Sequence, residues 1–392
     1  MGASGRSARK RPKGRTAGRS GAPTEAWLGL LPADPRPWLL SCDEPSARWL
    51  TLSELVDGPV DEVALARAHR DVLDDPGTQA LLDRLPGWDD PAGFSGHNSP
   101  AFAPNLLNLL ADVGVAGGDD ARIERLLDAM LEHQRGDGRF PSYGSYPRSA
   151  PPVWGVLPCD THAITEVLVR FGRAGDGRVQ RAAARIEADL AETDQGPGWL
   201  CRPDPAVGFR GPGRKGDVCP QVTLEALRVL ARLGRVTPSG ATAARTALTV
   251  WRQRARHRPY MFGHGRRFRT IKWPTFWYDV HAVLDTLTRI PELWSGDGAR
   301  PEDRTALAEL AACMIAANVD EHGVVTPRSC YRGFEAFSFG QKDRPSPFAT
   351  ARVAVVLRRL GDLAETVAAI DTGAIDTGAI DTAAIDTGAI DT

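Results

Sequence analysis

Apolar residues gather in short, dense runs along the middle of the chain, and each run ends at a glycine or a turn. Five such segments span residues 101–114, 160–172, 222–234, 279–290 and 349–361, and they are rich in Leu, Val and Ala on nearly all sides. A helix that is apolar all round is typical of a buried position. The pattern therefore predicts five buried helices.

More amphipathic segments alternate with the buried ones, at residues 121–134, 178–192, 241–254 and 303–319. Each pairs with the buried helix before it, so that one inner and one outer helix form a unit. A closed ring of helical hairpins satisfies this alternation. We therefore expect an all-α protein, an α/α toroid of five to six hairpins, with the sixth supplied by residues 50–86.

Two of the buried segments are copies of one another, which supports a repeat architecture. DTHAITEVLVRF (160–171) and DVHAVLDTLTRI (279–290) align without a gap, and Arg170 matches Arg289. Each copy begins with Asp-x-His, and aspartate at a helix start is favoured as an N-cap.

The paired Asp-x-His motifs are also candidate chemistry. A histidine in the first turn of a helix stays neutral, because the helix dipole disfavours its protonation, and can serve as a base or ligand. The inner helices of a toroid converge on one mouth, so we expect Asp160, Asp279, His162 and His281 as catalytic candidates. The alternative is that the aspartates only cap and the histidines only pack.

Long connections of about 25 residues precede the buried helices, and such lengths are often functional. They interleave aromatic and basic side chains, which predicts a cavity that binds an apolar chain and an anionic group; stacking that merely fixes the loops is the alternative. The basic candidates are Arg214, Lys215, Arg266, Arg267, Arg269 and Lys272. The aromatic candidates are Trp154, Trp199, Trp273, Phe276 and Trp277.

Composition changes this picture little. With 392 residues, 42% hydrophobic, 25% charged and a net charge of −1, the chain reads as a globular domain at 26–365 between a basic tail (1–25) and a low-complexity acidic tail (366–392). No apolar run approaches the roughly 20 residues of a membrane span. A short basic segment is more often simply solvated than bound to nucleic acid or to an anionic membrane surface, so solvation is the favoured interpretation of the basic tail. A sequence-specific nucleic-acid partner is not expected. Six cysteines without CxxC spacing indicate a reduced, cytoplasmic protein.

One short motif resembles a sequence motif of a known protein family. Gln134-Arg-Gly-Asp-Gly138-Arg-Phe140 is similar to the QxxDGxW/F motif of the squalene cyclase and protein prenyltransferase superfamily, with weaker versions at 194–199 and 318–323. Residues 272–279 resemble bacterial squalene-cyclase-like proteins of unassigned activity. The resemblance covers about residues 95–362, and it implies an α/α toroid that binds or transforms an isoprenoid, its diphosphate, or a similar amphiphile.

The sequence also departs from that family. The DxDD motif of class II cyclases is absent, since the nearest string, Asp71-Val-Leu-Asp74-Asp75, has the wrong spacing. Prenyltransferases hold zinc on an Asp-x-Cys pair and a distant histidine, and here the resemblance implies Asp217, Cys219 and His281. Cys219 stands about one turn earlier than the family pattern, and His281 about one residue late.

Three functional classes remain open from the sequence. The first is a prenyltransferase-like or cyclase-like protein for isoprenoids, with zinc as its implied cofactor. The second is a carbohydrate-active α/α barrel that uses Asp160 and Asp279 as acid and base. The third is a non-catalytic toroid that binds a partner at its mouth.

Overall fold

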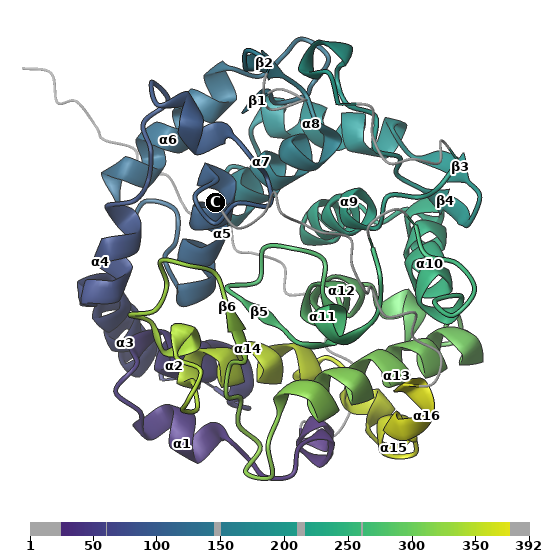
Figure 1. Ribbon diagram of the computed structural model, residues 1–392. Helices are drawn as coiled ribbons and strands as arrows, with labels where there is room; N and C mark the ends of the chain where they lie inside the picture. Colours follow the sequence, from purple (N-terminus) through teal and green to yellow (C-terminus); the bar gives the residue numbers. More distant parts are fainter. Residues whose placement is uncertain (1–24, 60, 145–149, 210–215, 260–261, 377–392) are drawn as a thin grey trace, which may run out of the picture.

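The computed structural model describes residues 25–59, 61–144, 150–209, 216–259 and 262–376. Its helices form two concentric sets around a common centre (Figure 1). This arrangement confirms the predicted all-α toroid. Residues 1–24 and 377–392, which hold most of the two predicted tails, lie outside the described residues.

Six inner segments close the ring within the described residues, and each packs against its neighbours. Five are the predicted buried helices, and the sixth is α2 with the π-helical turn that follows it, which packs against α14 and α5. The inner segments are α2 (Pro45–Leu50) with Thr51–Leu55, α5 (Ala103–Val113), α7 (Pro158–Arg170), α9 (Pro220–Arg232), α12 (Val280–Leu287) and α14 (Pro347–Arg358).

Outer helices form the wall around this ring. They are α3 (Glu62–Asp74), α4 (Pro76–Leu82), α6 (Ala121–Glu132), α8 (Gly177–Ala188), α10 (Pro238–Arg252), α13 (Pro301–Asn318) and α15 (Ala364–Ala368). The remaining α-helices of the described residues are α1 (Arg36–Ser41), α11 (Arg266–Arg269) and α16 (Thr372–Asp376). Short 3-10 helices lie in the connections, at Ala26–Leu30, Pro91–Phe94, Pro205–Val207, Pro291–Leu293, Ser338–Gly340 and Gly361–Leu363. Helix α16 contacts α13 and buries Ile375, so packed structure continues past residue 366.

The long connections contain three two-stranded pairings. Antiparallel pairs join β1 (Ser142–Gly144) with β2 (Val153–Gly155) and β3 (Ala191–Thr193) with β4 (Gly196–Gly198). A parallel pair joins β5 (Lys272–Trp273) with β6 (Ser329–Cys330), and in Figure 1 it crosses in front of the inner helices.

Local sequence signals explain where the inner helices start and stop. Proline occupies the first turn of α5, α7, α9 and α14, where its missing N–H costs no hydrogen bond. Gly114, Gly172 and Gly234 follow the helices with φ of 116°, 84° and 64°, a left-handed conformation that glycine adopts without strain. The chain can therefore reverse sharply toward the next outer helix.

Gln134, the first residue of the QxxDGxW/F-like motif, links two outer helices through hydrogen bonds of its side-chain amide. Its amide donates to the carbonyl oxygens of Arg178 (2.7 Å) and Gly138 (3.0 Å), which joins the end of α6 to the start of α8. Gly138 has φ of 89°, and Phe140 is buried. The side chain thus ties the turn after α6 to the first turn of α8.

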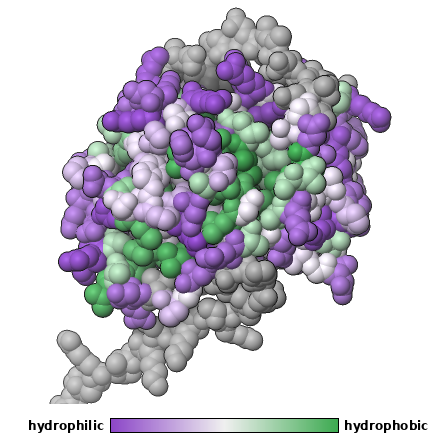
Figure 2. All heavy atoms as spheres, turned by 90° about the horizontal axis from the view of Figure 1, so that it is seen from below, coloured by the Kyte–Doolittle hydropathy of each residue, from purple (hydrophilic) through white to green (hydrophobic). Residues whose placement is uncertain are grey.

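Hydrophilic side chains dominate the face of the molecule shown in Figure 2, with apolar atoms between them. Among the helices of the described residues, none combines the length and apolarity needed to cross a bilayer.

Candidate functional site

The inner helices turn charged side chains toward the centre of the ring. When the five repeated helices are aligned at their closing turns, one position holds Asp112, Arg170, Arg232, Arg289 and Arg359. Four residues earlier, the first four helices carry Asn108, Glu166, Arg228 and Asp285. Three residues earlier still, Glu225 and Arg352 occupy equivalent positions. Spacings of three and four keep all of these on one face of each helix.

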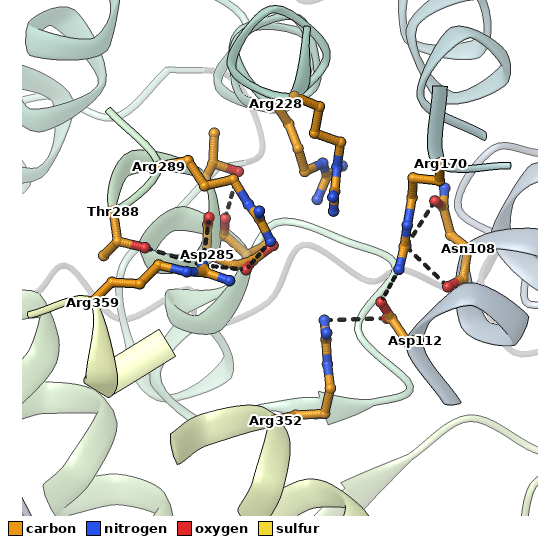
Figure 3. A network of polar contacts seen from close by, with 12 residues as sticks. Asn108, Asp112, Arg170, Arg228, Asp285, Thr288, Arg289, Arg352 and Arg359 are labelled. Atoms are coloured by element: carbon orange, nitrogen blue, oxygen red, sulfur yellow. Dashed lines mark hydrogen bonds and ion pairs between the residues drawn. The ribbon is translucent and has the colours of Figure 1, made fainter. Parts of the chain in front are cut away.

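Asp112 bridges two arginines from different helices (Figure 3). Its carboxylate accepts a hydrogen bond from Arg170 at 2.6 Å and pairs with Arg352 at 3.2 Å. Arg170 also donates to the side-chain oxygen of Asn108 at 3.0 Å. Burial alone would raise the pKa of Asp112, but Arg352 and Arg170 lower it, so the carboxylate is ionised at neutral pH.

Asp285 repeats this arrangement on the other side of the centre. Its Oδ1 atom accepts from Arg289 at 2.9 Å and from Arg359 at 2.8 Å. Burial opposes ionisation here too, yet the arginines hold the pKa of Asp285 well below its usual range. The carboxylate therefore carries a full charge between two guanidinium groups.

Glu166 forms the third bridge. Its oxygens lie 2.8 Å from Nε of Arg228 and 3.0 Å from Nε of Arg232. These arginines lower the pKa of Glu166 against the effect of burial. By contrast, burial raises the pKa of Glu225 to about 8, despite Arg228 nearby, so this carboxyl group is mainly neutral at pH 7.

The centre consequently carries an excess of positive charge. Six arginines meet three ionised carboxylates, which leaves 6 − 3 = 3 positive charges. Burial lowers the pKa of Arg232 to about 9, still above neutral pH. Buried guanidinium groups held in place by carboxylates are suited to bind an oxyanion.

A cavity of about 40 Å³ opens among these side chains, enough for roughly three waters or one small oxyanion. Its walls come from α5, α7, α9, α12 and α14, and from Thr275 and Phe276 in the connection before α12. Two buried atoms on its lining residues have no hydrogen-bond partner within the described structure: Glu225 Oε2 and His281 Nε2. Unsatisfied polar atoms beside a polar cavity indicate a site for a polar ligand.

The basic residues predicted from the loops lie elsewhere. Arg266 and Arg267 are exposed on α11, Arg269 donates to the carbonyl oxygen of Ile375 (3.3 Å), and Lys272 lies 4.0 Å from the ring centre of Tyr331. None of these four lines the central cavity. Arg214 and Lys215 fall outside the described residues.

The predicted aromatic residues lie in different places: two in the core, one at the surface, one on the wall of the central cavity and one beside His97. Trp199 and Trp273 are buried in the core, and Trp154 stacks at the surface on Trp88 with ring centres 5.0 Å apart. Phe276 alone among the predicted aromatics lines the cavity, while Trp277 lies 5.2 Å from the ring of His97.

The N-cap prediction is confirmed for Asp279 and wrong for Asp160. Asp279 accepts a hydrogen bond from the backbone N–H of Ala282 at 2.8 Å, and burial raises its pKa to about 7. Helix α7 instead begins at Pro158, whose ring fixes a helical φ, so Asp160 lies inside the first turn. Asp160 and Asp279 do not line the central cavity, and the structure gives no support to a paired acid and base there.

The two predicted histidines differ in their surroundings. His162 is buried between helices with Nδ1 3.2 Å from the carbonyl oxygen of Val222, whereas His281 lines the central cavity. Burial lowers the pKa of both to about 4, so both are neutral at pH 7.

The zinc set implied by the family resemblance does not fit. The Asp217 carboxylate accepts from Gln195 at 3.0 Å and lies 3.1 Å from His257, while His281 faces the central cavity. Within the described part of the chain, Asp217, Cys219 and His281 do not gather as a group of metal donors.

The sequence-based expectations did not include the arginines at the centre, because the basic candidates were the residues of the long connections. A signal existed: Arg170 and Arg289 match in the aligned repeat, and Arg232 and Arg359 occupy the same place two residues before a glycine. A charge at one fixed position of successive buried helices predicts a charged axis in a toroid.

The similarity of the chain to known proteins is limited to solved structures. No model of a protein family matches the chain, and no curated protein matches it. Among solved structures, it is similar to the type II terpene cyclase MstE from Scytonema, determined with its substrate geranylgeranyl dihydroxybenzoate. The similarity covers 87% of this chain and 96% of that chain, with 13% identity and a TM-score of 0.38. The fold assignment therefore rests on the helices of the chain itself.

Proposed function

We propose that the toroid binds a phosphate-type oxyanion at its centre, either as a free ion or as the head of an amphiphile such as an isoprenoid diphosphate. The observation that carries this proposal is the ratio of six arginines to three ionised carboxylates at the centre of the ring, where four of the arginines and all three carboxylates line one small cavity. An anion of two or three charges would offset most or all of the excess of three positive charges.

Arginine suits this task better than other cations. Its planar guanidinium group presents several donors that match the oxygens of a phosphate, and it stays charged when buried. Here each guanidinium is oriented by a carboxylate before a ligand arrives, so little conformational entropy is lost on binding. In Figure 3, Arg228 points into the space between the Asp112 and Asp285 groups.

An apolar tail fits this cavity poorly, because most of its walls are polar or charged side chains. Phe276 is the aromatic residue of the lining, and its ring lies 5.4 Å from Tyr331 and 6.2 Å from Phe334. We expect the tail of an amphiphile to lie against this aromatic group.

The test is titration calorimetry of the full-length protein with inorganic phosphate, diphosphate and farnesyl diphosphate at constant ionic strength, with chloride as the reference. We expect one saturable site, at least tenfold weaker binding in Arg228→Met, and unchanged binding in Arg266→Met, which removes an exposed arginine. Tighter binding of farnesyl diphosphate than of diphosphate supports an amphiphile, and equal affinity a free anion. Absence of binding by all three ligands, or equal losses in the two variants, would refute the proposal.

A further inference from the structure

We infer that the chain has a second site, which binds a zinc-type divalent cation through His97, Cys159 and Asp160. Their donor atoms all lie within 4.8 Å of one another. None of the three lines the central cavity, so this site goes beyond the proposed oxyanion site and does not depend on it.

The distances suit a single metal ion. His97 Nδ1 lies 3.7 Å from Asp160 Oδ1, and Cys159 Sγ lies 3.9 Å from the same oxygen. Zinc bonds of about 2.0 Å to nitrogen or oxygen and 2.3 Å to sulfur, at tetrahedral angles, place such donors about 3.3 to 3.5 Å apart. The two pairs that involve Asp160 would each shorten by roughly 0.4 Å, and the His97 and Cys159 donors, which lie within 4.8 Å, would approach by up to about 1.3 Å. Side-chain rotation can supply shifts of this size.

The surrounding structure orients each donor. Asp160 is 2% exposed and Cys159 4%, both in the first turn of α7. Ser142, on β1, donates its hydroxyl to Asp160 Oδ2, which leaves Oδ1 facing the other two donors. A hydrogen bond to the second oxygen of a carboxylate ligand is typical of metal sites, where it fixes the ligand.

His97 is positioned from two sides. Asn105 of α5 donates to the backbone carbonyl of His97 at 2.8 Å, and the ring of Trp277 lies 5.2 Å from the imidazole. The histidine belongs to the connection before α5, whereas the other donors belong to α7. A metal ion would thus join two neighbouring units of the ring.

The donor set selects the metal. One nitrogen, one thiolate sulfur and one carboxylate oxygen are ligands that zinc accepts, whereas Mg²⁺ and Ca²⁺ prefer oxygen alone. Three protein ligands leave a fourth position for water or substrate, as in catalytic zinc sites. Burial raises the pKa of Cys159 and of Asp160, and a bound cation would favour the ionised form of both.

The experiment uses the full-length chain without a histidine tag, stripped with a chelator and titrated with Zn²⁺ against a competing indicator. We expect one equivalent to bind, excess Mg²⁺ not to displace it, and Co²⁺ to produce a thiolate charge-transfer band. Stoichiometric binding and the band should be lost in Cys159→Ala and His97→Ala. They should persist in Cys219→Ala, a matched control that removes another buried thiol at the start of an inner helix.

Two further measurements separate loss of the zinc site from loss of folding: the zinc affinity of Ser142→Ala, and the folding and phosphate binding of His97→Ala. Ser142→Ala keeps all three donors and should weaken zinc binding by about 10- to 100-fold. His97 is partly exposed, so His97→Ala is expected to fold, which circular dichroism checks, and to retain phosphate binding. The inference is overturned if the wild type binds no zinc, if Cys159→Ala retains it, or if Cys219→Ala alone loses it.

Discussion

Replacing Glu166 with glutamine tests the charge balance at the centre of the ring. Glu166 is 3% exposed in its side chain and is the counter-ion of both Arg228 and Arg232. Glutamine keeps the shape of the side chain and removes its charge. The excess at the centre would rise from three positive charges to four, and the partly buried guanidinium groups of Arg228 and Arg232 would lose their counter-ion.

The expected loss of stability is large. Breaking a buried ion pair from one side costs about 3–5 kcal/mol, because the remaining charge stays desolvated. The matched control is Glu187→Gln, which breaks a half-exposed pair with Arg235 (2.6 Å) and should cost less than about 1 kcal/mol. Both changes remove one negative charge from the protein, so only the location differs.

The same substitution should strengthen phosphate binding. With one more unbalanced positive charge, Glu166→Gln should bind phosphate about tenfold more tightly, which adds about 1.4 kcal/mol to its stabilisation at saturating phosphate. Urea unfolding followed by circular dichroism, with and without phosphate at constant ionic strength, measures both effects. A loss below 1 kcal/mol without phosphate, or a phosphate effect no larger than in the wild type, would show that the centre does not carry the charge that we assign to it.

Three other predictions follow from single side chains. Burial raises the folded-state pKa of Glu225 from 4.5 to about 8, so Glu225 should cost the wild type up to about 5 kcal/mol of stability as pH rises from about 4.5 to 8. In urea unfolding across that range, Glu225→Gln should remove this contribution and leave that of Asp279, whose pKa burial raises to about 7. The pKa of His281 is lowered from 6.5 to about 4, so its contribution is complete above pH 6.5 and disappears as pH falls to 4; His281→Asn should flatten that acid limb, and an unchanged slope would contradict the assignment. Gly138→Ala should cost about 1–3 kcal/mol in thermal unfolding, because φ is 89° and the new Cβ would lie 2.9 Å from the carbonyl oxygen of Arg181, whereas Gly136→Ala, with open space around it, should change little.

The fold could be predicted because its signals are local and repeated. Buried helices are apolar on nearly all sides, their ends carry proline and glycine, and the repeat sets the order of units. The sixth hairpin was predicted at residues 50–86, and its inner segment begins earlier, at Pro45, because α2 is only six residues long and continues as a π-helical turn. Such a short piece has no periodicity to detect.

The site was harder to predict, because it depends on which side chains face one another across the ring. Asp112 and Arg352 are 240 residues apart in sequence and pair at 3.2 Å. His97 and Asp160 come from different units, and no spacing in the sequence connects them. By contrast, the Asp217 and Cys219 pair resembled a known motif, and the structure separates it from His281.

The number of arginines at the centre is itself an argument for a ligand. Buried ion pairs seldom stabilise a protein better than apolar residues of the same size, since desolvation offsets their attraction. The inner helices pack well with Leu, Val and Ala elsewhere, so apolar side chains could occupy the central positions too. An equal number of arginines and carboxylates would at least be neutral, but here each carboxylate serves two arginines. A phosphate group supplies about −1.5 to −2 charges at pH 7 and several acceptor oxygens. The excess charge that destabilises the empty ring is therefore the same charge that would hold the ligand.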